Sequence, residues 1–131
     1  MAAKILIVED NLPNHELVKY LLDHAGYITF SAWDGTEGMH ILREANLDLV
    51  LCDLQMPVMN GYEMVRLLKT NEQLRQIPVI AVTASSMSGD SDKVIASGFD
   101  GYVSKPIDPE SFVSQIEGFL PPGLRASSVA N

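Results

Sequence analysis

Short apolar runs alternate with longer amphipathic segments along the chain, and this alternation constrains the fold more than any other feature of the sequence. Five runs are predicted to be β-strands: Lys4–Val8, Tyr27–Ala32, Leu47–Cys52, Pro78–Val82 and Gly101–Ser104. A helix-length segment separates each run from the next, which indicates parallel strands joined by right-handed crossover helices on both faces of a sheet. We therefore predict an α/β fold, a single doubly wound parallel sheet of five consecutive βα units.

Polar residues mark where the intervening helices are predicted to begin. A residue that can accept a backbone hydrogen bond precedes each amphipathic segment, and in two cases a glutamate follows three residues later, as in a capping box. The five positions are Asn11, Asp34 (with Glu37), Asn60 (with Glu63), Ser88 and Asp108, the last with Pro109 in the first helical turn. Gly26 and Gly98 are expected to end the first and fourth helices.

Composition narrows the class of protein. The chain of 131 residues is long enough for one domain, which we place at residues 1–121, followed by a flexible C-terminal tail at residues 122–131. The net charge of −8 argues against direct binding to nucleic acid or to an anionic membrane, because both need a basic surface. The single cysteine, Cys52, is expected to pack in the core, and the absence of a secretory segment favours a cytoplasmic location.

Polar side chains follow four of the predicted strands at their carboxyl ends. Glu9 and Asp10 follow the first strand, Asp53 the third, Thr83 the fourth and Lys105 the fifth. In a doubly wound sheet, ligands bind beyond the carboxyl ends of the strands, where the strand order reverses. If these four strands are neighbours, three carboxylates, one hydroxyl and one ammonium group converge on one rim.

The chemistry of such a rim favours phosphoryl transfer. Clustered carboxylates repel one another, so some become protonated unless a cation enters the cluster. Mg²⁺ suits the cluster, because it prefers oxygen ligands and keeps water molecules that phosphate oxygens can replace. A nucleophilic aspartate beside the ion can attack a phosphoryl group and form an aspartyl phosphate. The lysine, the hydroxyl and backbone N–H groups would then hold the phosphoryl oxygens.

Four motifs, in order along the chain, resemble the response-regulator receiver domain, the CheY-like domain of two-component signalling. They read ILIVEDN, DLVLCDLQMPVMNGYE, IPVIAVTA and DGYVSKPID, and the resemblance covers Lys4 to about Leu120. It implies the flavodoxin-like strand order 2-1-3-4-5. It also implies a phosphorylation-dependent switch that accepts a phosphoryl group from a sensor histidine kinase or a histidine phosphotransfer protein. Such a domain is not an enzyme, apart from promoting its own phosphoryl transfer and slow autodephosphorylation.

The resemblance assigns roles in phosphorylation and switching. Asp53 is expected to be the phosphoacceptor, and Thr83, Lys105 and the backbone N–H of Ala84 are expected to hold the phosphoryl oxygens. Thr83 and Tyr102 are the expected switch residues. Signal output to a downstream target or output domain is expected through the face formed by the fourth helix, the fifth strand and the fifth helix. The peptide bond between Lys105 and Pro106 is expected to be cis.

The resemblance also implies a metal site. The ion, Mg²⁺ or Mn²⁺, is expected to bind Asp10, Asp53 and the backbone carbonyl of Gln55, with Glu9 contributing through a water molecule. No other cofactor is expected.

Two other functions fit parts of the pattern. A haloacid-dehalogenase-type phosphatase or phosphotransferase also uses a strand-end aspartate with Mg²⁺, but it needs a second acid two residues later, and Gln55 there can act neither as an acid nor as a base. A flavodoxin-like electron carrier shares the strand order, but Glu9 and Asp10 would repel its phosphate. The sequence leaves open whether the domain acts alone or belongs to a hybrid kinase or a longer regulator.

The three histidines and the single tryptophan have no predicted role in phosphorylation or metal binding. His15, His24 and His40 lack the spacing of metal ligands and are expected on solvated helix faces. Trp33 follows the second predicted strand, and the sequence gives it no role.

Overall fold

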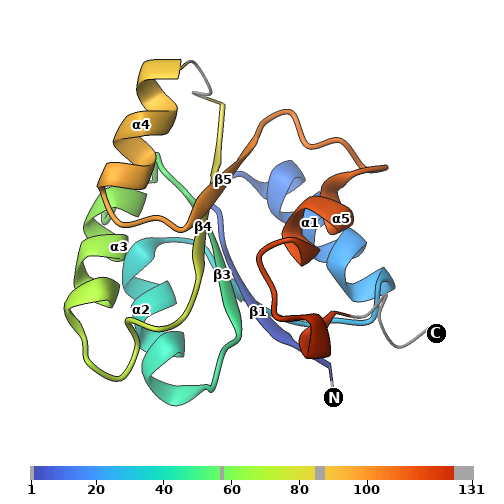
Figure 1. Ribbon diagram of the computed structural model, residues 1–131, viewed down its shortest axis with the longest axis horizontal. Coiled ribbons are helices and arrows are strands. Elements are labelled where there is room, and N and C mark those ends of the chain that lie inside the picture. The colour runs from blue at the N-terminus through green and yellow to red at the C-terminus, as the bar shows by residue number, and fades with distance from the viewer. Residues whose placement is uncertain (1, 57, 85–87, 126–131) are drawn as a thin grey trace.

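The computed structural model describes residues 2–56, 58–84 and 88–125, and strands alternate with helices as predicted (Figure 1). The strands are β1 (Lys4–Val8), β2 (Ile28–Ala32), β3 (Leu49–Asp53), β4 (Val79–Thr83) and β5 (Gly101–Ser104). The helices are α1 (Leu12–His24), α2 (Gly35–Glu44), α3 (Gly61–Thr70), α4 (Ser88–Ala96) and α5 (Phe112–Glu117), and a short 3₁₀ helix, η1, covers Pro122–Leu124.

The five strands are parallel and lie in the order β2-β1-β3-β4-β5, which confirms the predicted doubly wound sheet. The chain runs outward from β1 to β2 and then returns to the other side of β1 as β3, so the strand order reverses between β1 and β3. The register aligns the carboxyl ends of the strands, because Asp53 pairs with Val82 and Thr83 pairs with Ser104. Residues that follow these ends therefore lie at one edge of the sheet.

Two hydrophobic cores hold the sheet, one on each face. Helices α2, α3 and α4 cover one face, and α1 and α5 cover the other (Figure 1). Successive residues of a strand point to opposite faces. On β1, Leu6 and Val8 accordingly pack on the side of α2–α4, whereas Ile5 and Ile7 pack on the side of α1 and α5. Burial on both faces explains why the central strands are apolar along most of their length.

The predicted caps are present at the first three helices. The side chains of Asn11 and Asp34 each accept a hydrogen bond from the backbone N–H three residues later, at 3.0 and 2.8 Å. Asn60 and Glu63 form a complete capping box, in which each side chain accepts from the other residue's backbone N–H. Gly26 follows the C-cap of α1 with φ +102°, as expected of a glycine that ends a helix.

The start of the last helix differs from the prediction. Helix α5 begins at Phe112 and not at Pro109, with Ser111 as its N-cap. The carboxylate of Asp108 instead accepts hydrogen bonds from the backbone N–H of Glu110 (3.2 Å) and the hydroxyl of Ser111 (2.8 Å). An aspartate that bonds the N–H two residues later stabilises a turn, and the helix starts only after that turn.

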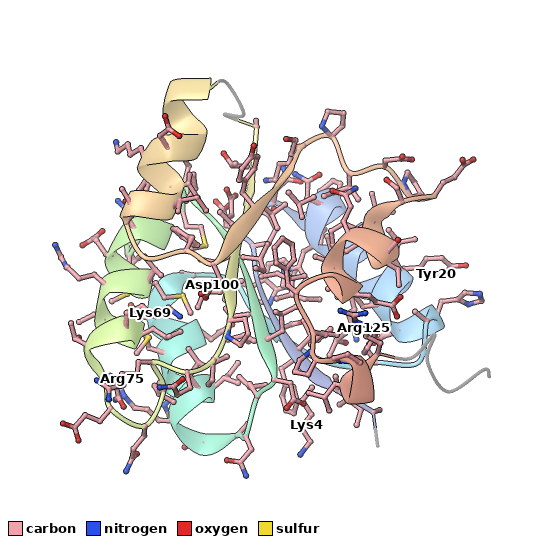
Figure 2. All side chains as sticks on the ribbon, viewed as in Figure 1. Lys4, Tyr20, Lys69, Arg75, Asp100 and Arg125 are labelled. Atoms are coloured by element: carbon pink, nitrogen blue, oxygen red, sulfur yellow. The ribbon has the colours of Figure 1, made fainter. Side chains whose placement is uncertain are left out.

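A charged pair joins the loops at the opposite edge of the sheet (Figure 2). The ammonium group of Lys69 donates to Asp100 (2.9 Å) and to the backbone carbonyls of Arg75 (3.2 Å) and Ile77 (3.1 Å). Asp100 also accepts from the backbone N–H of Val79 (2.8 Å). These contacts connect the end of α3, the start of β4 and the loop before β5. They therefore hold the amino ends of β4 and β5 together.

A hydrogen-bonded segment follows α5. After η1, the guanidinium group of Arg125 donates from Nε to the carbonyl of Leu120 at 3.0 Å. Residues 126–131 of the expected tail lie outside the described residues, and their flexibility stays a prediction. None of the helices in the described ranges is both long enough and apolar enough to span a bilayer.

Candidate functional site

The carboxyl ends of four strands surround a cavity of about 350 Å³, at the edge of the sheet where the strand order reverses. Six of the predicted site residues contribute to its lining, together with two asparagines. The lining residues are Asp10, Asn11, Asn14, Asp53, Gln55, Thr83, Ala84 and Lys105. Glu9 lies buried behind them, and Tyr102 lies on β5 outside the lining, with 37% of its surface exposed.

Three carboxylates meet at this edge. Glu9, Asp10 and Asp53 each place a carboxylate oxygen within 4.8 Å of the others. Glu9 and Asp53 are nearly buried, at 4% and 9% exposure, whereas Asp10 is exposed to the cavity. An oxygen-only donor set with one open side fits a hard divalent cation such as Mg²⁺ or Mn²⁺ and would not suit a soft, thiolate-binding metal.

Lys105 is the positive group of the site. Its ammonium group lies 2.8 Å from Oε1 of Glu9 and 3.3 Å from Oδ2 of Asp53. Burial lowers the pKa of Lys105, but its hydrogen bond with Glu9 and the charges of both carboxylates outweigh this and raise the pKa above its ordinary value. The lysine therefore stays charged. The peptide bond to Pro106 is cis, as predicted.

The clustering and burial of the acids raise the pKa of Glu9. Burial is the main cause that raises the pKa of Glu9 to about 7, and its hydrogen bond and charge interaction with Asp53 add to the increase. The contacts with Lys105 and with the backbone N–H of Asn11 act in the opposite direction but are weaker. Near neutral pH and without a cation, this carboxyl group is therefore partly protonated, as expected of clustered carboxylates.

The loop after β3 fixes the orientation of Asp53. Oδ1 of Asp53 accepts a hydrogen bond from the backbone N–H of Gln55 (3.2 Å), which leaves Oδ2 facing Lys105. Helix α3 begins directly against this loop, where the N–H of Gly61 donates to the carbonyl of Leu54 (3.0 Å). A Cβ atom on Gly61 would lie 2.5 Å from the backbone oxygen of Asp53, so only glycine permits this approach.

The structure adds three residues at or beside the site that were not predicted to lie there. Asn11 and Asn14 line the cavity from the start of α1, one turn apart on the side that faces the strand ends. Asn14 lies four residues after Asp10 and three after Asn11, and this helical spacing is the signal that could have identified it. His15, expected on a solvated face, is only 1% exposed and its Nδ1 lies 2.9 Å from the backbone oxygen of Glu9. That expectation was wrong, because the imidazole ring stacks on the indole of Trp33, which follows β2.

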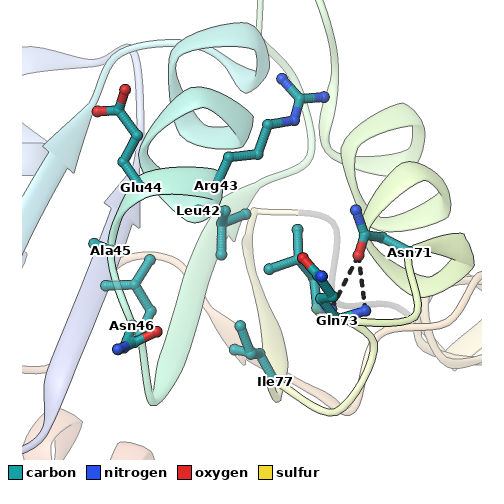
Figure 3. A pocket seen from close by; sticks show the side chains of 10 residues that line it. Leu42, Arg43, Glu44, Ala45, Asn46, Asn71, Gln73 and Ile77 are labelled. Carbon is teal, nitrogen blue, oxygen red and sulfur yellow. Dashed lines mark hydrogen bonds between the residues drawn. The ribbon is translucent and has the colours of Figure 1, made fainter.

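A second hollow of about 300 Å³ lies at the amino ends of β3 and β4 (Figure 3). It is lined by the end of α2 and the loop after α3, and the side chain of Asn71 is occupied there by the backbone N–H groups of Gln73 and Leu74. Glu44 is its one carboxylate among the lining residues, and no predicted site residue reaches it. Apart from Tyr102, the predicted site residues therefore lie at the carboxyl ends of the strands and not around this second hollow.

The chain is similar to several known proteins in sequence and in fold. Residues 5–117 match the family model of the response regulator receiver domain. The polar-differentiation response regulator DivK of Brucella ovis is 41% identical over 120 residues, which cover 92% of this chain and 98% of that protein. The chemotaxis response regulator CheY4 of Vibrio cholerae has a TM-score of 0.87 at 29% identity and covers 92% of this chain and 100% of that chain. The receiver domain of a sensor histidine kinase from Pseudomonas aeruginosa, solved with a magnesium ion coordinated in its active site cleft, has a TM-score of 0.82 at 28% identity, with 90% and 97% coverage.

Proposed function

Because the chain belongs to the family of response-regulator receiver domains and is a phosphorylation-dependent signalling switch, we propose that Asp53 is the residue that becomes phosphorylated. One observation supports this choice above the others. Among the three clustered acids, Asp53 alone both lines the cavity and contacts Lys105, with Oδ1 held by the loop and Oδ2 facing the ammonium group. A nucleophile in that position is oriented before the donor arrives.

The neighbouring groups supply what a transferred phosphoryl group needs. Transfer breaks the bond between phosphorus and the donor's leaving atom, a histidine nitrogen in a kinase or phosphotransfer partner, and forms a bond to a carboxylate oxygen of Asp53. The ammonium group of Lys105 and, at the end of β4, the hydroxyl of Thr83 and the backbone N–H of Ala84 would hold the phosphoryl oxygens. Charge neutralisation and positioning are the main contributions that proteins make to this reaction.

The same edge would hold the cation. Asp10, Asp53 and the backbone carbonyl of Gln55 would bind Mg²⁺ or Mn²⁺ directly, and Glu9 through water, which the oxygen-only cluster supports. The bound ion would neutralise the acids and the incoming phosphoryl group. The Pseudomonas receiver domain, which carries magnesium in its own cleft, supports the assignment by analogy.

The switch would act between proteins in the cytoplasm. The phosphoryl donor would be a sensor histidine kinase or a histidine phosphotransfer protein, and the phosphorylated domain would bind its target through the face of α4, β5 and α5. Thr83, drawn toward the phosphoryl group, would make room for Tyr102 to turn inward from its exposed position on β5. An acidic chain of net charge −8 fits protein partners better than nucleic acid or a membrane surface.

Gln55 supports a switch over a phosphatase. It stands two residues after Asp53, where a haloacid-dehalogenase-type enzyme needs an acid to protonate the leaving group and activate water. An amide does neither, so the aspartyl phosphate would persist until slow autodephosphorylation. The comparisons give no support to a phosphatase.

Phosphorylation of Asp53 can be tested by intact-protein mass spectrometry. Incubation with a small-molecule phosphodonor and Mg²⁺ should add one phosphoryl group that hydroxylamine removes. The variant Asp53→Asn should gain none, while Asp108→Asn, an acid outside the cavity, should behave as the unchanged protein. A full mass increase in Asp53→Asn would exclude the assignment.

The role of Lys105 has a separate test. Lys105→Arg keeps the positive charge but replaces a compact ammonium group with a planar fork that cannot make the same point contact. The variant should fold normally and accept the phosphoryl group, yet it should lose the phosphorylation-linked NMR shift changes at Thr83 and Tyr102. Unaltered shift changes in the variant would show that Lys105 has no part in the switch.

A further inference from the structure

The ring of His15 is a buried polar group that the proposed phosphoryl chemistry does not use. It lies on α1 with 1% of its surface exposed, and Nδ1 is 2.9 Å from the backbone oxygen of Glu9. A carbonyl oxygen can only accept a hydrogen bond, so Nδ1 carries the proton and donates it. The imidazole is therefore oriented with its Nδ1–H donor directed at the backbone oxygen of Glu9, the first residue of the acidic pair Glu9 and Asp10.

Trp33 fixes the other side of the ring. The indole and the imidazole stack with their centroids 4.0 Å apart and their planes 17° apart. Trp33 directly follows Ala32, the last residue of β2, whose carbonyl accepts a hydrogen bond from the backbone N–H of Glu9 at 3.1 Å. Both polar backbone atoms of Glu9 are thus held, the N–H by the end of β2 and the carbonyl by α1.

The second ring nitrogen shows what the imidazole contributes at this position. Nε2 of His15 is buried and has no hydrogen-bond partner in the described part of the chain, which costs free energy. An apolar side chain of similar size would fill the same space beside Trp33 without an unpaired nitrogen. The Nδ1–H donor is consequently what histidine adds here.

We propose that His15 is a positioning residue for the acidic pair and thereby sets the affinity of the site for its divalent cation. The carbonyl of Glu9 belongs to the planar peptide unit that joins Glu9 to Asp10. A hydrogen bond to that oxygen fixes the rotation of the plane, and with it the directions in which the two carboxylates leave the backbone. Groups that orient metal ligands in this way typically change metal affinity by 10–100-fold when they are removed. The inference rests on the cation site of the proposed function.

Two substitutions separate the donor from the ring. His15→Phe keeps an aromatic ring to stack on Trp33 but removes the donor, whereas His15→Asn removes the ring and keeps an N–H donor close to the position of Nδ1. The dissociation constant for Mg²⁺ is measured by calorimetry, and that for Mn²⁺ by the loss of the free-ion electron paramagnetic resonance signal. We expect about tenfold weaker binding of both ions in His15→Phe and binding within about twofold of the unchanged protein in His15→Asn.

A third variant controls for general loosening of the fold. Val18→Ala removes buried volume from the same helix, three residues further on, where the side chain packs toward α5 and not toward the acids. It should lower the unfolding midpoint and leave Mg²⁺ binding unchanged, with all variants measured where circular dichroism shows them folded. Equal weakening in His15→Phe and Val18→Ala, equal weakening in both His15 variants, or unaltered binding in His15→Phe would each overturn the positioning role. If the unchanged protein fails to bind Mg²⁺ beyond a matched salt control, the proposed cation site itself is wrong and the inference falls with it.

Discussion

The buried carboxylate of Glu9 changes its charge within the ordinary working range of pH. Its pKa is raised to about 7, because burial and the neighbouring Asp53 outweigh the favourable contacts of the charged form. In the unfolded chain the same group has its ordinary, lower pKa, so the native state binds the proton more tightly than the unfolded chain does. The stabilisation that this proton provides is complete below the ordinary pKa of a glutamate and is lost as the pH rises through about 7.

The metal-free protein should therefore become less stable between about pH 5 and pH 8. Urea unfolding in the presence of a chelator should show a decrease on the order of 2 kcal/mol in unfolding free energy over this range. In Glu9→Gln, which cannot titrate, most of that decrease should disappear. A decrease of the same size in Glu9→Gln would assign the pH dependence to other groups.

Val58 has a backbone conformation that suits other residues better. Its φ is +70°, and its side chain is 82% exposed in the loop between β3 and α3. For a β-branched residue the left-handed region is sterically strained, by roughly 1–2 kcal/mol, whereas asparagine and glycine adopt it readily. Val58→Asn and Val58→Gly should raise the unfolding free energy by about 0.5–1 kcal/mol. Val58→Ala should gain less, because alanine has neither the freedom of glycine nor the local side-chain hydrogen bond of asparagine. A lower thermal midpoint in both of the first two variants would show that this loop is not strained.

At the scale of elements, the sequence predicted the strands and the first three caps, because apolar runs and capping residues are local signals. The strand order was predicted from the resemblance to receiver domains, since no local signal encodes which strands are neighbours. The start of α5 was misplaced by three residues, since aspartate followed by proline is compatible both with a helix cap and with the turn that Asp108 closes. The burial of His15 was unpredictable for a different reason. It depends on a stack with Trp33 from a separate βα unit, and no pattern within α1 encodes that contact. Convergence of the site residues was predictable because strand ends in such a sheet share an edge.

The segment after α5 packs tightly on β5, and a substitution at Gly101 can test this contact. A Cβ atom on Gly101 would lie 2.3 Å from the ring of Phe119, so the ring packs directly on the bare backbone of the strand. Gly101→Ala should lower the unfolding free energy by about 1–3 kcal/mol through overpacking. The same substitution at Gly123, where a Cβ atom would meet nothing within 4 Å, should have little effect. Adding Phe119→Leu to Gly101→Ala should recover part of the loss, and a purely additive double variant would contradict the proposed clash.

For the whole molecule, the acidic cluster is expected to link the stability of the fold to cation binding. The fold holds Glu9, Asp10 and Asp53 together, whereas the unfolded chain lets them separate, so their repulsion raises the free energy of the native state alone. With a dissociation constant of about 1 mM, adding about 10 mM Mg²⁺ should stabilise the protein by RT ln(1 + 10), about 1.4 kcal/mol. That corresponds to about 4 °C in Tm for a domain of this length.

Matched sodium chloride is the control for this prediction, because general screening would act equally in both salts. Asp10→Asn and Asp53→Asn should raise the metal-free Tm and reduce the increment from Mg²⁺. If Mg²⁺ does no more than matched salt, or if both variants melt below the unchanged protein without metal, the carboxylates do not form a cation site.

The buried position of Cys52 makes the alkylation rate of its thiol a measure of local unfolding. Its thiol is 1% exposed in the central strand β3, next to Asp53, and burial raises its pKa, so a thiol reagent can react only after the middle of the sheet has opened. The rate of alkylation then equals the opening equilibrium multiplied by the intrinsic rate of a free thiol. If the proposed cation at the carboxyl end of β3 must leave before the strand can separate, about 10 mM Mg²⁺ at a dissociation constant of about 1 mM should slow alkylation roughly tenfold. The one cysteine of the chain would thus report, in minutes or hours, how often the centre of the sheet comes apart and whether the neighbouring site is occupied when it does.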